Sequence, residues 1–168
     1  VLDRHQEDVA PRLRDFQGQG DVTITETIRS DAIEVVKIMV QLEDSGLLFG
    51  IGFDPNSLGG LLSDLVDAGI PEEKLLRVAT GFRLAAAIKT TERWVAAGQI
   101  EHRHRPLMDW CVSNARVELR GNAIVITKMK SGTAKIDPVM AMFNSVDIMA
   151  TNPPAQRVAL DFTRMEPV

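Results

Sequence analysis

Two acidic residues, each followed by proline, are of a type and in a setting that could bind a metal ion. Asp54 lies in GIGFDPNS, directly after a short apolar run, and Asp137 lies in KIDPVMAM, before a run of Val, Met and Ala. Carboxylates that converge from separate elements can chelate Mg²⁺ or Mn²⁺, because hard divalent cations prefer oxygen ligands. Two such ions about 4 Å apart could activate water and stabilise the leaving oxygen in phosphodiester cleavage.

Each acidic residue also has a simpler structural interpretation. Asp54 before a proline is typical of a turn, with Asn56 or Ser57 capping the next helix. Asp137 before Pro138 is typical of a helix N-cap followed by a good first helical residue. The residue types alone therefore leave metal binding and local structure open at both positions.

A basic segment, EHRHRP, holds two histidines that would share a face if the segment is extended. His102 and His104, with Cys111 nearby, could begin a zinc site, but the remaining spacing fits no standard zinc motif. We favour a basic cluster, either on the surface or close to DNA, in which Arg103 and Arg105 accompany the histidines.

Three lysines form a second basic group close to Asp137 in the sequence. Lys128 and Lys130 end a predicted strand, and Lys135 directly precedes the final helix. They are either a solvated strand end or contacts to phosphate beside the acidic site.

Composition limits the classes of protein to consider. The chain has 168 residues, enough for one domain with a sizeable core, and a net charge of −4, which is not typical of a general nucleic-acid binder. A local grip on DNA remains compatible with that charge. Cys111 is the single cysteine, so no internal disulfide can form, and no apolar run approaches the roughly 20 residues that span a membrane. P-loop, GxGxxG and GxSxG motifs are absent.

The pattern of apolar residues predicts alternating strands and helices. Two facing strands near the C-terminus are joined by a Gly-Asn turn, and a final helix follows them. This order is typical of an α/β layered domain. In chain order the sequence predicts a short polar helix or arm (3–16), a strand (22–28), a helix up to Gly46, a strand (47–53), a helix (57–69), a strand (74–80), helices (82–98 and 107–114), the two facing strands, and a helix (137–149).

Several segments together resemble the C-terminal nuclease domain of the large terminase subunits of tailed phages. They are GFDP, GQIEHRHRPLMDWCVSNARV and GNAIVITKMKSGTAKIDPVMAM, and GDVTITETIRSDAI resembles the family's approach to its first long helix. The resemblance covers about residues 12 to 150. The positions that match the family's pattern are Asp54, His102, Pro106, Trp110, Asn114, Lys130 and Asp137.

This resemblance implies a ribonuclease H-like fold, with a mixed sheet flanked by helices. It also implies an endonuclease that uses two divalent metals, Mg²⁺ or Mn²⁺, to cut concatemeric DNA during genome packaging. Three acids carry the metals in the family, and two of them match Asp54 and Asp137. Asp137 would then cap its helix and also bind metal.

Further expectations concern DNA and partner proteins. His102, Arg103, Lys128, Lys130 and Lys135 would contact double-stranded DNA. The full-length protein would bind the small terminase subunit and the portal, with no membrane involved, in the cytoplasm of the host cell.

The chain also departs from the family pattern. The family's first acid lies on an early strand that has no counterpart here, so we expect an N-terminally truncated domain over residues 1–150, followed by a tail or linker over 151–168. Pro138 stands where the family usually has glycine. Exposed sheet edges would favour self-association, and two carboxylates alone would leave nuclease activity weak or absent.

Two other classes of protein remain open from the residues. One is a non-catalytic α/β module that docks DNA or a packaging component, with both acids in structural roles. The other is a Rossmann-type ligand-binding domain, which the absence of a glycine-rich loop disfavours.

Overall fold

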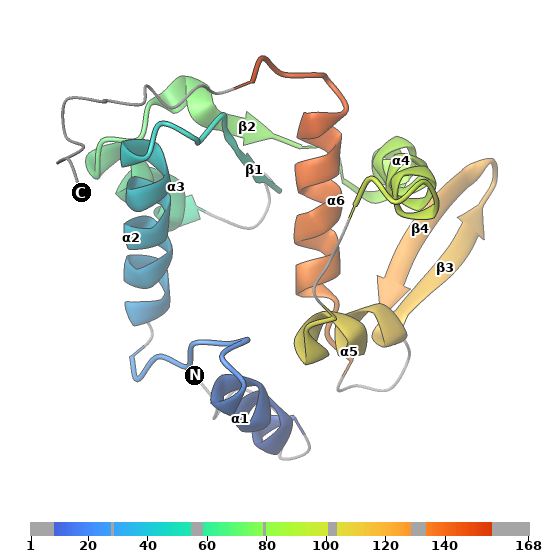
Figure 1. Ribbon diagram of the computed structural model, residues 1–168, viewed down its shortest axis with the longest axis horizontal. Coiled ribbons are helices and arrows are strands. Elements are labelled where there is room, and N and C mark those ends of the chain that lie inside the picture. The colour runs from blue at the N-terminus through green and yellow to red at the C-terminus, as the bar shows by residue number, and fades with distance from the viewer. Residues whose placement is uncertain are drawn as a thin grey trace, which may run out of the picture.

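The computed structural model describes residues 9–27, 29–54, 59–78, 80–100, 104–128 and 134–155. In this part of the chain helices and strands alternate as an α/β domain (Figure 1). The elements are α1 (Ala10–Gly18), α2 (Ser30–Asp44), β1 (Ile51–Phe53), α3 (Gly59–Asp67), a 3₁₀ helix (Glu72–Lys74), β2 (Leu75–Arg77), a second 3₁₀ helix (Gly81–Leu84), α4 (Ala85–Ala96), α5 (Pro106–Asn114), β3 (Ala115–Arg120), β4 (Ala123–Lys128) and α6 (Asp137–Met149).

Most of the predicted elements are present with shifted ends. Pro11 does not interrupt the first helix, because it lies in the first turn of α1, where a missing N–H costs little. Gly46 and Gly98 follow α2 and α4 with φ angles of 69° and 67°, a left-handed conformation that suits glycine at a helix end. The predicted strands over 47–53 and 74–80 shorten to β1 and β2.

The strand predicted over residues 22–28 is wrong. The described part of this segment, residues 22–27, is irregular. Alternation of apolar and polar residues favours a strand only where a neighbouring strand accepts its backbone hydrogen bonds. Among the described residues no strand pairs with this segment.

The strands form two separate pairs in the described part of the chain. β1 and β2 are parallel, with Ile51 opposite Leu75, as a strand–helix–strand unit requires. β3 and β4 form an antiparallel hairpin in which Ala115 pairs with Lys128. The α/β class is confirmed, with parallel and antiparallel pairs lying in different sheets.

Helix α6 occupies the middle of the molecule. It stands between the β1–β2 pair on one side and α4 with the hairpin on the other, and α5 lies across its beginning (Figure 1). The buried core joins α4, α5 and α6, and two hairpin side chains, Ile124 and Ile126, pack against it. Its buried members are Leu84, Ala87, Ile88, Cys111, Val139 and Phe143.

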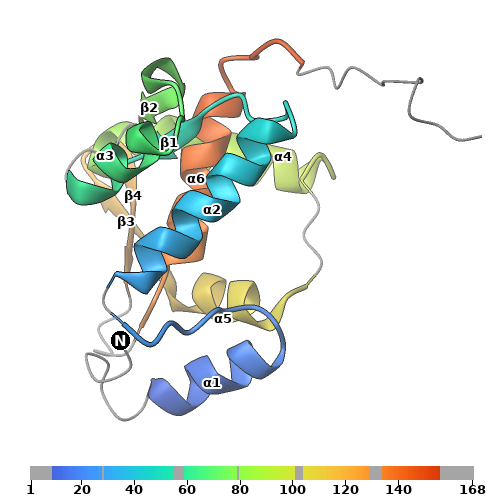
Figure 2. The ribbon, with the colours of Figure 1, turned by 90° about the vertical axis from the view of Figure 1, so that its left-hand side faces the viewer.

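Helix α1 packs beside α5, away from the β1–β2 pair (Figure 2). The rings of Phe16 and Trp110 lie 5.5 Å apart, and the guanidinium of Arg12 lies 5.3 Å from the Trp110 ring. None of the described helices combines the length and the apolar character needed to cross a membrane.

Candidate active site

Asp54 is the first residue after β1, and it is half-buried. Functional groups of open α/β sheets gather at the C-terminal ends of parallel strands. Its position is therefore the one that the sequence predicted.

Gly52 brings β1 against α6. A Cβ atom at this position would lie 2.7 Å from Cδ1 of Ile148 and 3.0 Å from Cγ1 of Val78, and 3.5 Å from the carbonyl oxygen of Asn144. A larger residue would require the Ile148 and Val78 side chains to shift. The strand that directly precedes Asp54 therefore packs against the helix that begins at Asp137.

Asp137 is exposed and is the first residue of α6. The prediction that it caps this helix is wrong, because the N-cap is Ile136. The carbonyl of Ile136 accepts the hydrogen bond from the Met140 amide at 3.0 Å, and the Ile136 side chain is buried, so Ile136 is the residue that precedes the first helical residue. In the first turn the carboxylate of Asp137 still lies where the helix dipole favours negative charge.

The two acids lie on packed elements but at different heights along α6. Asn144 faces Gly52, and a rise of about 1.5 Å per residue places Asp137 about 10 Å nearer the start of the helix. Figure 1 shows β1 pointing toward the middle of α6. Within the described ranges no group of three or more His, Cys, Asp or Glu side chains is placed to hold a metal ion. Carboxylate oxygens fit Mg²⁺ or Mn²⁺ in kind, while the described residues do not supply a complete ligand set.

A pocket of about 210 Å³ lies beside the start of α6 and includes Asp137. Cys111 lines it from α5 with no exposed surface. Burial, and then the negative charge of Asp137, raise the pKa of the Cys111 thiol from 9.0 to about 11. The other lining residues are Leu13, Val22, Leu107, Trp110, Lys135 and Pro138.

Two hydrogen bonds between distant residues hold the elements around this pocket. The Asn114 side chain, at the end of α5, donates through Nδ2 to the Lys135 carbonyl at 3.1 Å. At the other end of α5, the amide of Leu107 donates to Oδ2 of Asp21 at 3.1 Å.

The Asp21 carboxylate connects the segment after α1 to the beginning of α5. Its side chain is 2% exposed, and Oδ1 lies 2.5 Å from Nε of Arg105 as an ion pair without hydrogen-bond geometry. Arg105 also donates to the Gln19 carbonyl at 3.2 Å. Asp21 could not be predicted from the sequence, since no local pattern relates it to residues so far along the chain.

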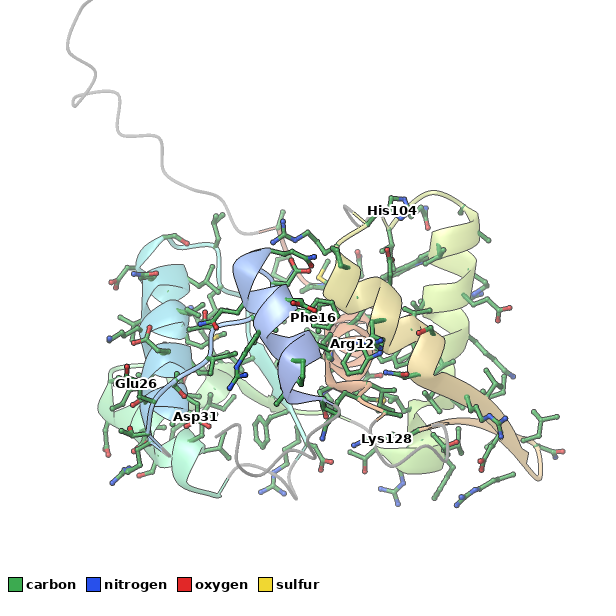
Figure 3. All side chains as sticks on the ribbon, turned by 90° about the horizontal axis from the view of Figure 1, so that it is seen from below. Arg12, Phe16, Glu26, Asp31, His104 and Lys128 are labelled. Atoms are coloured by element: carbon green, nitrogen blue, oxygen red, sulfur yellow. The ribbon has the colours of Figure 1, made fainter. Side chains whose placement is uncertain are left out.

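The residues predicted to contact DNA are only partly described. Lys128 is exposed at the end of β4, and Lys135 is half-buried in the pocket beside Asp137. Figure 3 shows Lys128 and His104 well apart, so the hairpin lysine and the described end of the His-Arg segment do not form one cluster. His102, Arg103 and Lys130 lie outside the described residues.

Fold and site together define an α/β domain with one carboxylate at the end of a parallel strand and another at the start of the last helix among the described residues. The family described as the terminase large subunit, endonuclease domain, matches residues 4–152, and the chain belongs to this family. The family predicted from the sequence is thereby confirmed.

A solved structure supports the same fold. The chain is similar to the crystal structure of the HK97 bacteriophage large terminase, with 25% sequence identity and a TM-score of 0.57. The match covers 70% of this chain and 24% of that one, so the chain corresponds to about a quarter of the length of that terminase. No curated protein gives a significant match.

Proposed function

We propose that this chain is the metal-dependent endodeoxyribonuclease domain of a phage or prophage large terminase subunit. In the full-length protein it would cut concatemeric DNA during genome packaging. Membership of the endonuclease-domain family supports the nuclease role. The structural observation that carries the proposal is the close packing of β1 on α6 at Gly52, which joins the elements that bear Asp54 and Asp137.

Asp54 and Asp137 would hold the cation, Mg²⁺ or Mn²⁺, and are the catalytic residues of this proposal. A bound divalent cation supplies Lewis-acid chemistry toward a phosphodiester. Two carboxylates hold two cations less firmly than three do, so we expect the 168-residue chain alone to be weakly active or inactive.

Contacts to DNA would come from basic side chains in the C-terminal half of the sequence, which also contains Asp137. Lys135 lines the pocket beside that residue, where its ammonium group can pair with a phosphate. Lys128, and with it His102, Arg103 and Lys130, would neutralise further phosphates, which is the sequence-independent part of DNA binding.

The remaining partners are proposed for the whole terminase. Double-stranded DNA is its substrate, and the small terminase subunit and the portal would bind the full-length protein in the host cytoplasm. We also propose that the chain by itself self-associates.

Divalent-metal binding tests the proposal directly. Mn²⁺ is titrated by calorimetry into the chain, into Asp54→Asn and Asp137→Asn, and into Asp44→Asn as a control at the end of α2. We expect binding to the parent chain and the control, and its loss in both site variants, because each substitution removes one anionic oxygen ligand. Equal binding by all four proteins would contradict the assignment of these residues.

A non-catalytic docking module is the second candidate function. It is favoured because, among the residues with described positions, no three His, Cys, Asp or Glu side chains are grouped so that they could bind a metal ion. Introducing Asp54→Asn and Asp137→Asn into a full-length terminase separates the two. Loss of DNA cleavage with unchanged DNA binding supports the nuclease, whereas unchanged cleavage supports the module.

A further inference from the structure

The segment that leads into α6 is fixed by its neighbours. Ala134 and Ile136 are each 5% exposed, so their side chains anchor the backbone on both sides of Lys135. The carbonyl of Lys135, two residues before Asp137, accepts the hydrogen bond from Asn114 in a half-buried environment. An unpaired carbonyl in such an environment costs free energy, so this hydrogen bond favours one backbone path into the helix.

Asn114 is itself held on a firmly packed helix. Cys111, one turn earlier on α5, is fully buried in the core with Val139 of α6. The ring of Trp110 packs against that of Phe16 of α1, with the ring planes tilted by 43°. At its other end, the Leu107 amide of α5 donates a hydrogen bond to the Asp21 carboxylate. The donor of the Asn114 amide is therefore placed by an element that resists movement.

We infer that Asn114 is a positioning residue for the metal-binding carboxylate of Asp137, acting through the backbone of Lys135. This inference rests on the proposed function. Without the hydrogen bond, the turn that carries Asp137 can shift, and the carboxylate samples positions that do not bind the cation. Outer residues that orient a metal ligand typically change metal affinity by about 10–100-fold when they are removed.

The variants remove the side-chain amide with little other change. Asn114→Ala deletes the donor, and Asn114→Ser is a milder change that leaves a hydroxyl too short to reach the same carbonyl. Ser113→Ala is the matched control, because the neighbouring hydroxyl donates to the Trp110 carbonyl within α5 and not to the segment before α6. Circular dichroism checks that each variant is folded.

Two measurements are made on each protein. Calorimetry with Mn²⁺ gives the metal affinity, alongside Asp137→Asn. Hydrogen exchange followed by mass spectrometry, in EDTA, gives the protection of the first turn of α6, where the Met140 amide bonds to the Ile136 carbonyl. We expect Asn114→Ala to weaken Mn²⁺ binding about tenfold or more and to speed exchange in this turn. In Asn114→Ala, the protection of α4 from hydrogen exchange should match that of the parent chain. Ser113→Ala should match the parent chain both in Mn²⁺ affinity and in hydrogen exchange of the first turn of α6.

The outcomes separate this inference from the proposed function. Mn²⁺ binding that is lost in Asp137→Asn but unchanged in both Asn114 variants overturns the role of Asn114. An unchanged rate of hydrogen exchange in the first turn of α6 of Asn114→Ala overturns it as well, whether or not the Mn²⁺ affinity changes. Absence of Mn²⁺ binding by the parent chain overturns the proposed metal site and, with it, the metal-positioning role of Asn114, even if exchange in the variants is faster.

Discussion

The thiol of Cys111 is buried between α5 and α6 next to the charge of Asp137, and its pKa rises to about 11. In the unfolded chain the thiol ionises near its ordinary pKa of 9.0. Between these two values the unfolded chain binds fewer protons than the folded chain. Folding stability should therefore be unaffected by this group below pH 9 and should fall as the pH rises toward about 11.

This thiol gives a prediction for alkaline pH. Across the interval we expect a loss on the order of 2 kcal/mol in the free energy of unfolding, because one pKa unit corresponds to about 1.4 kcal/mol. Urea unfolding at pH 8 to 11 in EDTA measures it. Cys111→Ala should show a shallower decline, since its other titrating groups are the same. Parallel curves for the two proteins would contradict the prediction.

Individual residues differ in how far sequence alone could reveal them. Asp54 and Asp137 stand at the junctions of apolar runs, so their positions at the end of β1 and the start of α6 follow from local pattern. Whether both bind a metal stays a prediction. The hydrogen bonds of Asp21 and Asn114 join residues that are distant in the sequence, and no local periodicity encodes such pairs.

At the scale of elements, the contact between β1 and α6 depends on the absence of one side chain. Gly52→Ala would place a methyl group against Ile148 and Val78, and overpacking of this kind costs about 1–3 kcal/mol of stability. Gly60→Ala is the matched control, since a Cβ there meets nothing within 4 Å. Alanine in helix α3 should be neutral or stabilising by roughly 0.5–1 kcal/mol. Urea unfolding of both variants measures the difference, and equal stabilities would refute the close contact.

Helices with strong apolar periodicity, and a hairpin with a clear turn signal, could be predicted from the sequence. A strand that would need an unspecified partner could not. Helices α2, α4 and α6 follow apolar spacing, and the Gly-Asn turn indicates the β3–β4 hairpin, whose Gly121 has a φ of 61°. The segment over 22–28 has equally strong alternation but no strand beside it in the described part of the chain. Strand formation depends on a partner, and a single segment does not specify that partner.

At the scale of the whole molecule, α2 presents an apolar stripe to solvent. Val35, Ile38 and Leu42, spaced so that they share one face, are 37%, 51% and 41% exposed. A contiguous exposed stripe favours association in water. We therefore expect the chain to self-associate through α2.

Sedimentation velocity over a range of concentrations tests this expectation. Ile38→Lys should shift the chain toward monomer, because a charge would be buried in the contact. Val95→Lys is the control, since Val95 on α4 is similarly exposed at 52% but lies outside the stripe. A parent chain that remains monomeric at all concentrations, or equal shifts by both variants, would exclude α2 as the contact.

The order of elements predicted the α/β class, but not the way the strands divide between sheets. Parallel pairing of β1 with β2 follows from the helix between them. Among the described residues the hairpin forms a sheet of its own, and its Ile124 and Ile126 pack against a core built from helices that are distant from one another in the sequence.

The packing of α6 on β1 also has a consequence for the time at which the domain matures on the ribosome. β1 is synthesised early, whereas α6 is the last helix of the described chain. Until α6 emerges, Gly52 has no helix to pack against, and the elements that carry Asp54 and Asp137 are not yet joined. Contacts between such distant segments form late. If Asp54 and Asp137 hold the cation as proposed above, the domain would acquire its metal site only when translation has passed α6.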